Sequence, residues 1–132
     1  MLIVPGGVVT DALRQTDLLD WLRTTHAQTR YTASICTGAF LLAQAGILRQ
    51  TATTHWEDIV DLRAAYPQLT VREDVRWLQD GADARVYSSA GISAGIDLSL
   101  HLVARLIGSE WAQKTARQMD YRGSWQSNKE SS

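Results

Sequence analysis

The sequence predicts an α/β protein built on a mainly parallel sheet. Short apolar, β-favouring runs alternate with segments of helical periodicity along the whole chain. Small residues follow three of the expected strands: Gly6-Gly7, Cys36-Thr37-Gly38 and Ser88-Ser89-Ala90-Gly91. Ligands on such sheets bind at the carboxyl ends of strands. We therefore expect these three turns to meet at one edge of the sheet.

Length and composition indicate one folded domain. The chain has 132 residues, of which 45% are hydrophobic and 20% charged, and no repeat or linker divides it. We expect a single domain over residues 1–123 and a polar tail over residues 124–132. The formal net charge of −1 offers nothing to attract nucleic acid or an anionic membrane.

The sequence also argues against several other classes of protein. No apolar run approaches the roughly 20 residues that span a bilayer, and no signal peptide precedes the first strand, so a cytoplasmic location is expected. Cys36 is the only cysteine, which excludes an internal disulfide and a multi-cysteine zinc site. His26, His55 and His101 lie far apart, which argues against a metal site. We expect neither a metal nor a cofactor.

Each strand is expected where a β-favouring run is closed by glycine, proline or small residues. These runs cover residues 2–5, 31–35, 51–54, 69–71, 75–79 and 84–87. Asp80-Gly81 separates the last two, which predicts a hairpin.

Helices are expected where apolar residues recur at helical spacing. They cover residues 17–23, 38–47, 56–66, 92–107 and 110–121. Thr16 and Ser109 are candidate caps, Glu57 and Asp58 supply acidic charge to a first turn, and Pro67 ends a helix.

The segment 92–107 is expected to be the longest helix. Its apolar residues at 92, 96, 100, 103 and 107 predict one buried stripe, which Leu98 and Leu102 broaden. Asp97, His101 and Arg105 follow one another at a spacing of four. We expect a solvated polar ridge or a structural salt link there rather than a catalytic pair.

Cys36 stands at the turn between a buried strand and an apolar helix. This arrangement presents a side chain at the sheet edge and points backbone N–H groups toward it, which favours a thiolate. Cys36 is therefore a candidate nucleophile. The alternative is a small buried hydrophobe without reactivity.

Four segments resemble the PfpI-type superfamily, which includes the Parkinsonism-associated deglycases and class I glutamine amidotransferase-like domains. The segments are Pro5-Gly6-Gly7, Ser34-Ile35-Cys36-Thr37-Gly38-Ala39, Ala52-Thr53-Thr54-His55-Trp56 and Ser89-Ala90-Gly91-Ile92-Ser93-Ala94-Gly95-Ile96-Asp97. The second and third are most similar to the branch that holds isonitrile hydratase-like enzymes and the sensor domains of AraC-type regulators. The resemblance implies a flavodoxin-like three-layer sandwich.

The resemblance also implies roles for individual residues. It makes Cys36 the nucleophile, Thr37 a second catalytic residue and His55 a neighbour of the cysteine. Alternatively, Thr37 caps the following helix and His55 is a histidine satisfied at a strand end. The candidate substrate-binding positions are the small residues of the three turns: Gly6, Gly7, Gly38, Ala90 and Gly91. Gly6 and Gly7 are also explained by a plain tight turn, and Gly38 by close packing under the cysteine.

The sequence departs from the family pattern in two ways. Thr37 stands where the protease-like branch has a histidine, which argues against a peptidase. The chain starts at the Pro5-Gly6-Gly7 strand, so the resemblance implies an amino-terminal truncation that removes the segment with the family's catalytic acid. Either the sequence is a fragment, or its start was assigned too late, or the protein has lost that half. Such a chain should leave an uncovered strand edge and an exposed apolar face. Family members are usually homodimers, and we expect one here.

We therefore expect an enzyme of isonitrile hydratase type that acts on a small molecule, with the acid supplied from elsewhere. One alternative is a non-catalytic ligand-sensing domain of an AraC-type regulator. Another is a redox or carbonyl-stress protein in which Cys36 is oxidised.

Overall fold

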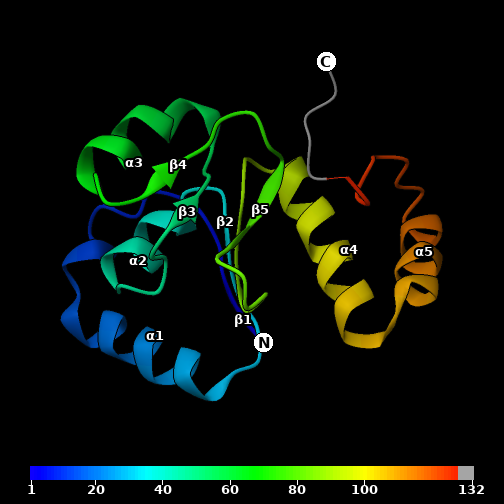
Figure 1. The fold of residues 1–132 in the computed structure, drawn as a ribbon, viewed down its shortest axis with the longest axis horizontal. Coiled ribbons are helices and arrows are strands. Elements are labelled where there is room, and N and C mark those ends of the chain that lie inside the picture. Colours follow the sequence, from blue (N-terminus) through cyan, green and yellow to red (C-terminus); the bar gives the residue numbers. More distant parts are fainter. Residues whose placement is uncertain (128–132) are drawn as a thin grey trace.

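The computed structural model describes residues 1–127, and residues 128–132 of the expected tail lie outside the described part. Its elements follow in chain order: β1 (Leu2–Val4), η1 (Ala12–Arg14), α1 (Thr16–Gln28), β2 (Thr32–Ile35), α2 (Gly38–Gln44), β3 (Thr51–Ala52), η2 (Trp56–Asp58), α3 (Ile59–Ala65), β4 (Thr70–Val71), β5 (Trp77–Asp80), β6 (Val86–Ser89), α4 (Ser93–Ile107) and α5 (Ser109–Gln118). Figure 1 shows α1, α2 and α3 on one side of the strands and α4 on the other, with α5 on the outer side of α4. No helix within residues 1–127 is long and apolar enough to cross a bilayer.

The central sheet has four strands in the order β1-β2-β6-β5. β1, β2 and β6 run parallel, with Ile3 opposite Ala33 and Ala33 opposite Tyr87. β5 is antiparallel to β6, as the expected hairpin requires. β3 and β4 form a separate parallel pair. The mainly parallel α/β sandwich is thus confirmed, and among the described strands β1 has a neighbour on one side only.

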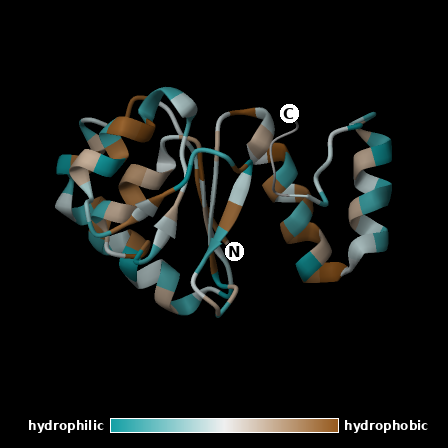
Figure 2. Ribbon diagram, turned by 45° about the horizontal axis from the view of Figure 1, so that its top comes forward, coloured by the Kyte–Doolittle hydropathy of each residue, from teal (hydrophilic) through white to brown (hydrophobic). Residues whose placement is uncertain are grey.

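Apolar side chains form three clusters that hold the layers together. One joins the sheet to α1, α2 and α3, with Leu2, Val4, Leu22, Leu42 and Leu62 among its members. The second lies between the sheet and α4, and the third lies between α4 and α5. Figure 2 shows the matching pattern, because α5 is coloured mainly teal and white whereas α4 carries several brown segments.

The expected buried stripe of α4 is wrong at its ends. Ile92 is 81% exposed and Ile107 is 62% exposed. The helix lies between two layers and therefore buries two faces. Leu98 and Leu102 pack toward the sheet, whereas Leu100 packs toward α5.

The expected solvated ridge on α4 is wrong at Asp97, for which the alternative, a structural salt link, is confirmed. Asp97 is fully buried and accepts hydrogen bonds from Arg76 Nε and Tyr121 Oη. His101 stacks on the ring of Trp77, with their centroids 4.0 Å apart. The Asp97–Arg76 ion pair thus joins α4 to the segment before β5, and the stacking of His101 on Trp77 joins α4 to β5 itself.

The described part of the expected tail contains one packed side chain. Trp125 is buried against Leu100, Ala112 and Ala116 in the cluster between α4 and α5. Hydrophobic contact therefore continues past residue 123.

His101 provides a test of this packing through the pH dependence of stability. Burial, and to a smaller extent the charge of Arg105, lowers the pKa of His101 below its ordinary value of 6.5. The unfolded chain therefore binds the proton first as the pH falls below 6.5, so this contribution to stability is present above that pH and is lost at lower pH. Substitution H101F keeps a ring on Trp77 and should reduce the loss of stability between pH 7 and pH 5.

The measurement is urea unfolding of both proteins at several pH values. The pKa of His26 is also lowered, mainly by burial, so some pH dependence should remain in both. Parallel pH profiles for the two proteins would contradict the assignment to His101.

Candidate active site

Cys36 occupies a sharp turn between β2 and α2, as expected. Its φ angle is +56°, in the left-handed region that non-glycine residues rarely adopt. Such a conformation costs about 1–3 kcal/mol and persists only where the surroundings impose it. The side chain is half-buried. A strained, partly accessible cysteine after a buried strand is the geometry expected of a nucleophile.

Gly38 lets α2 approach β1 closely. A Cβ atom placed on Gly38 would overlap the carbonyl oxygen of Val4 and come within 2.9 Å of that of Pro5. Gly38 itself is buried at the start of α2. This contact supports the packing explanation for Gly38.

Thr37 is joined to the Gly6-Gly7 loop by two hydrogen bonds. Its Oγ1 donates to the carbonyl oxygen of Gly7 and accepts from the Gly7 N–H, both at 2.8 Å. Thr37 occupies the N-cap position of α2, as the alternative prediction requires, but its side chain makes no capping bond to the helix. Thr37 instead fixes the position of the loop that follows β1.

Gly6 brings the same loop against Cys36. A Cβ atom on Gly6 would lie 2.9 Å from both Cys36 Cβ and Thr37 Oγ1, closer than ordinary van der Waals contact. The Gly6-Gly7 loop and the Cys36 turn therefore form one continuous surface.

Two adjacent threonines hold the segment that carries His55. Thr53 donates through Oγ1 to the carbonyl of Arg72 at 2.6 Å, and its N–H donates to Ser88 Oγ at 3.0 Å. Thr54 Oγ1 donates to the carbonyl of Cys36 at 2.8 Å. Neither threonine was identified as functional from the sequence, because nothing in the local pattern shows where a buried hydroxyl points.

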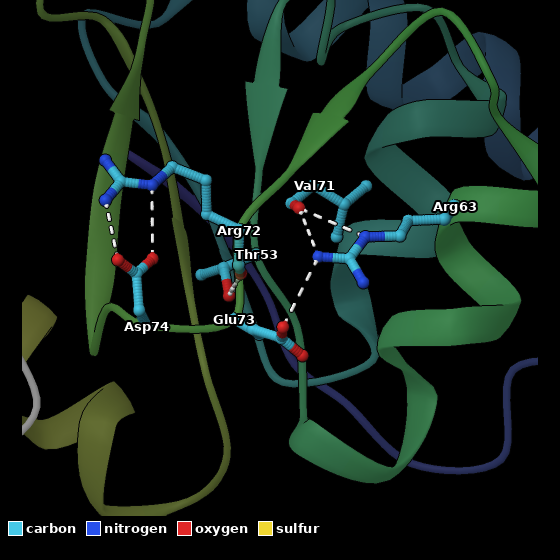
Figure 3. Close-up of polar contacts among 6 residues, drawn as sticks. All are labelled: Thr53, Arg63, Val71, Arg72, Glu73 and Asp74. Atoms are coloured by element: carbon cyan, nitrogen blue, oxygen red, sulfur yellow. Dashed lines mark hydrogen bonds and ion pairs between the residues drawn. The ribbon is translucent and has the colours of Figure 1, made fainter.

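Figure 3 shows how the end of β4 is fixed beside Thr53. Arg63 of α3 donates to the Val71 carbonyl through Nε at 3.2 Å and Nη2 at 2.9 Å, and its Nη2 lies 3.9 Å from Glu73 Oε1. Arg72 pairs with Asp74 at 3.0 Å. Thr53 is thus bonded to the segment that follows β4, and Arg63 of α3 in turn holds the end of β4 in place.

His55 lies over the start of α4. A Cβ atom on Gly91 would overlap its ring, which explains the glycine at that position. The Nδ1 atom accepts from the Glu57 N–H at 3.3 Å and lies 3.7 Å from Asp58 Oδ2. A neutral imidazole that accepts at Nδ1 carries its proton on Nε2. His55 can therefore present a proton donor on the side of Gly91.

Five of the eight expected site residues line two cavities, whereas Cys36, Gly6 and Gly38 line neither of them. One of about 360 Å³ contains Gly7 and Thr37 together with Phe40, Asp58 and Asp61. The other, of about 270 Å³, contains His55, Ala90 and Gly91. The Thr54–Cys36 hydrogen bond links the segments on which the two groups lie. Asp58 and Asp61 were not identified as site residues from the sequence, because both resemble ordinary surface charges of a helix.

A larger cavity of about 420 Å³ lies away from these residues. His26, Arg49 and Arg85 are among the residues that line it, and His26 bonds Thr32, the first residue of β2. This cavity therefore lies at the amino-terminal ends of the parallel strands. Within residues 1–127, no group of three His, Cys, Asp or Glu side chains is arranged to hold a metal ion.

Comparison with known proteins gives one family match and relatives of two kinds. The sequence profile of the DJ-1/PfpI family matches residues 1–105. The isonitrile hydratase of Pseudomonas putida is 37% identical over 92% of this chain, which covers 51% of that protein. The HTH-type transcriptional regulator CdhR of Pseudomonas aeruginosa is 36% identical over 86% of this chain, which covers 32% of the regulator. The chain thus spans about half or less of the length of these curated relatives.

A solved structure of a protein named for the same family is similar to this chain. A ThiJ/PfpI family protein from Pseudomonas syringae superposes with a TM-score of 0.76 at 25% identity, covering 93% of this chain and 50% of that one.

The close approach at Gly38 can be tested by substitution. G38A would push a methyl group into the carbonyl oxygens of Val4 and Pro5, and overpacking of this kind costs about 1–3 kcal/mol. We expect a lower free energy of unfolding in urea together with slower alkylation of Cys36 in the folded state, because the turn moves.

G46A is the matched control. Gly46 has φ +75°, but a Cβ atom added there would have no other atom within 4 Å. This variant should therefore lose about 1 kcal/mol from backbone strain alone and leave Cys36 alkylation unchanged. Equal effects of the two substitutions on Cys36 would contradict a special role for the Gly38 contact.

Proposed function

Because this chain belongs to the DJ-1/PfpI family, we propose that it carries the nucleophile of a cysteine-dependent enzyme of isonitrile hydratase type. The observation that carries the proposal is the Cys36 turn, where a strained, half-buried cysteine lies against a loop fixed by Thr37. The name of the Pseudomonas putida relative supplies the reaction class.

The reaction can be written with every atom accounted for. The Cys36 thiolate attacks the terminal carbon of the isonitrile R–N≡C, and that carbon takes a proton to give the thioimidate R–N=CH–S–Cys36. Water adds to the same carbon and the C–S bond breaks, which gives R–NH–CHO, the thiolate and the proton that was taken up in the first step. The net change is addition of one water molecule. Covalent catalysis of this kind divides one difficult addition into two easier ones.

The residues around Cys36 have distinct tasks in this scheme. Thr37 keeps the Gly6-Gly7 loop against the turn, so that the substrate meets a preformed surface. His55 is a candidate proton donor through Nε2. Asp58 and Asp61 supply carboxylates to the cavity that contains Thr37.

A second candidate function is favoured by the regulators among the relatives. CdhR matches 86% of this chain at 36% identity, so a related domain serves in a transcriptional regulator. In that case the cavities beside Cys36 bind a small molecule without turnover. Saturable binding of an isonitrile or formamide with no product would favour this alternative.

We also propose that the chain forms a homodimer through β1. Among the described strands β1 pairs only with β2, and Ile3 on this strand is 43% exposed. An unpaired strand edge with an exposed apolar residue favours pairing with a second chain.

Replacement of the nucleophile tests the enzyme proposal. C36S keeps the size of the side chain but removes the thiolate, and it should abolish formamide production, with a decrease in kcat of at least about 10³-fold. Production is followed by liquid chromatography and mass spectrometry with an alkyl isonitrile, and circular dichroism checks the fold. Undiminished turnover by C36S would eliminate this mechanism.

Light scattering tests the dimer. The wild-type chain should elute with twice its 14.6 kDa mass, whereas I3K should be monomeric because a lysine charge would be desolvated at the β1 edge. V60K, at an exposed position on α3, is the matched control and should remain dimeric. A monomeric wild type, or a dimer that survives I3K, would rule out this interface.

A further inference from the structure

We propose that the cavity lined by Thr37, the residue after Cys36, admits the substrate to Cys36, selecting neutral and cationic electrophiles and excluding anionic ones. This inference rests on the proposed function in one respect, namely that Cys36 reacts with a small molecule that enters by this cavity. It adds the charge class of the substrate, which the sequence and the relatives leave open.

The cavity has an acidic and apolar lining. Its apolar side chains come from the loop after β1, from η1 and from α2: Val8, Val9, Leu13 and Phe40. Among the described residues, Asp58 and Asp61 are the only charged ones that line it. No lysine, arginine or histidine of residues 1–127 joins them there, so two carboxylates set the sign of its potential.

Neither carboxylate is neutralised by a permanent cation among the described residues. Asp58 lies 3.7 Å from His55 Nδ1, but that nitrogen accepts the Glu57 N–H and bears no proton in the neutral ring. Asp61 makes no ion pair within residues 1–127. Glu57, next to Asp58, adds a third acidic group nearby.

The neighbouring cavity does not reverse this charge. Arg76 is the only permanent cation that the described part of the chain places in its lining. The Arg76 guanidinium bonds the buried carboxylate of Asp97 and Ser93 Oγ, and that ion pair is internally neutral. The uncompensated charges of the cavity lined by Thr37 are therefore those of Asp58 and Asp61.

Phe40 adds a second feature that favours a cation. Phe40 lines the same cavity as the two carboxylates, and an aromatic ring attracts a positive charge to its face. A substrate with an ammonium or other cationic group would meet both. A carboxylate- or sulfonate-bearing substrate would be repelled while it loses its hydration.

The single cysteine makes a direct test possible with charged thiol reagents. The methanethiosulfonates carrying a trimethylammonium-ethyl group or a sulfonato-ethyl group differ in charge, and the methyl reagent is neutral. In each case the Cys36 thiolate attacks the sulfenyl sulfur, a disulfide forms and methanesulfinate leaves. Rates are measured by mass spectrometry of the intact protein and divided by the rate of the same reagent with 2-mercaptoethanol.

We expect the normalised cationic-to-anionic rate ratio of the wild type to exceed one. D58N and D61N should each reduce this ratio by about threefold, and the double substitution by about tenfold, as expected for removal of unit charges near the reacting sulfur. The effects should shrink in high salt. The rate with the neutral reagent should change less, which separates a field effect from altered thiol reactivity.

E110Q is the matched control, because Glu110 pairs with Lys114 on α5, away from this cavity. It should leave the ratio unchanged. A wild-type ratio of one or less, or a ratio that D58N and D61N do not change, would overturn the inference and indicate approach from the side of His55. Circular dichroism of each variant confirms the fold.

The outcomes also separate this inference from the enzyme proposal. A charge-dependent ratio without isonitrile turnover supports the cavity's selectivity and removes the hydratase. Turnover by the wild type with a charge-independent ratio keeps the hydratase and removes the selectivity.

Discussion

The contact between β1 and the turn that follows β2 is the constraint on which the candidate site depends. Gly38 allows α2 to start against the carbonyl oxygens of Val4 and Pro5. Gly6 lies against Cys36 for the same steric reason. A side chain at either position would separate the strand ends, and Cys36 would lose the surroundings that hold its backbone in the left-handed region.

The segment that carries His55 is held by a separate set of hydrogen bonds. Asp80, at the end of β5, accepts from the N–H groups of Arg49, Gln50 and Thr51 at 2.8–3.0 Å and so fixes the start of β3. From there Thr53 bonds toward β4 and β6, and Thr54 bonds the Cys36 carbonyl. The carboxylate of Asp80, on a strand distant in sequence, thus helps to position the segment that carries His55.

The sequence predicted most of the elements because each has its own periodicity and end signals. The two-layer burial of α4 could not be predicted in the same way. A helix between a sheet and another helix buries two faces, and the apolar residues 92 and 107 fall beyond the reach of both layers. Asp97 looks like a surface charge in the sequence, and only the fold brings Arg76 and Tyr121 to it.

The candidate site was predictable in part for a related reason. Cys36, Thr37 and the glycines lie at turns whose residue types have a local steric cause. Asp58 and Asp61 enter the site because η2 and α3 place them opposite the loop after β1, and no local pattern encodes that relation.

The paired hydrogen bonds between Thr37 and Gly7 also bear on motion. One hydroxyl serves as donor and acceptor to the same residue, so the loop separates from the turn only when both bonds are broken. Opening is then a cooperative event with a defined free energy rather than a gradual loosening. The exchange of the Gly7 amide hydrogen, although that residue is exposed, reports how often the loop separates from the turn.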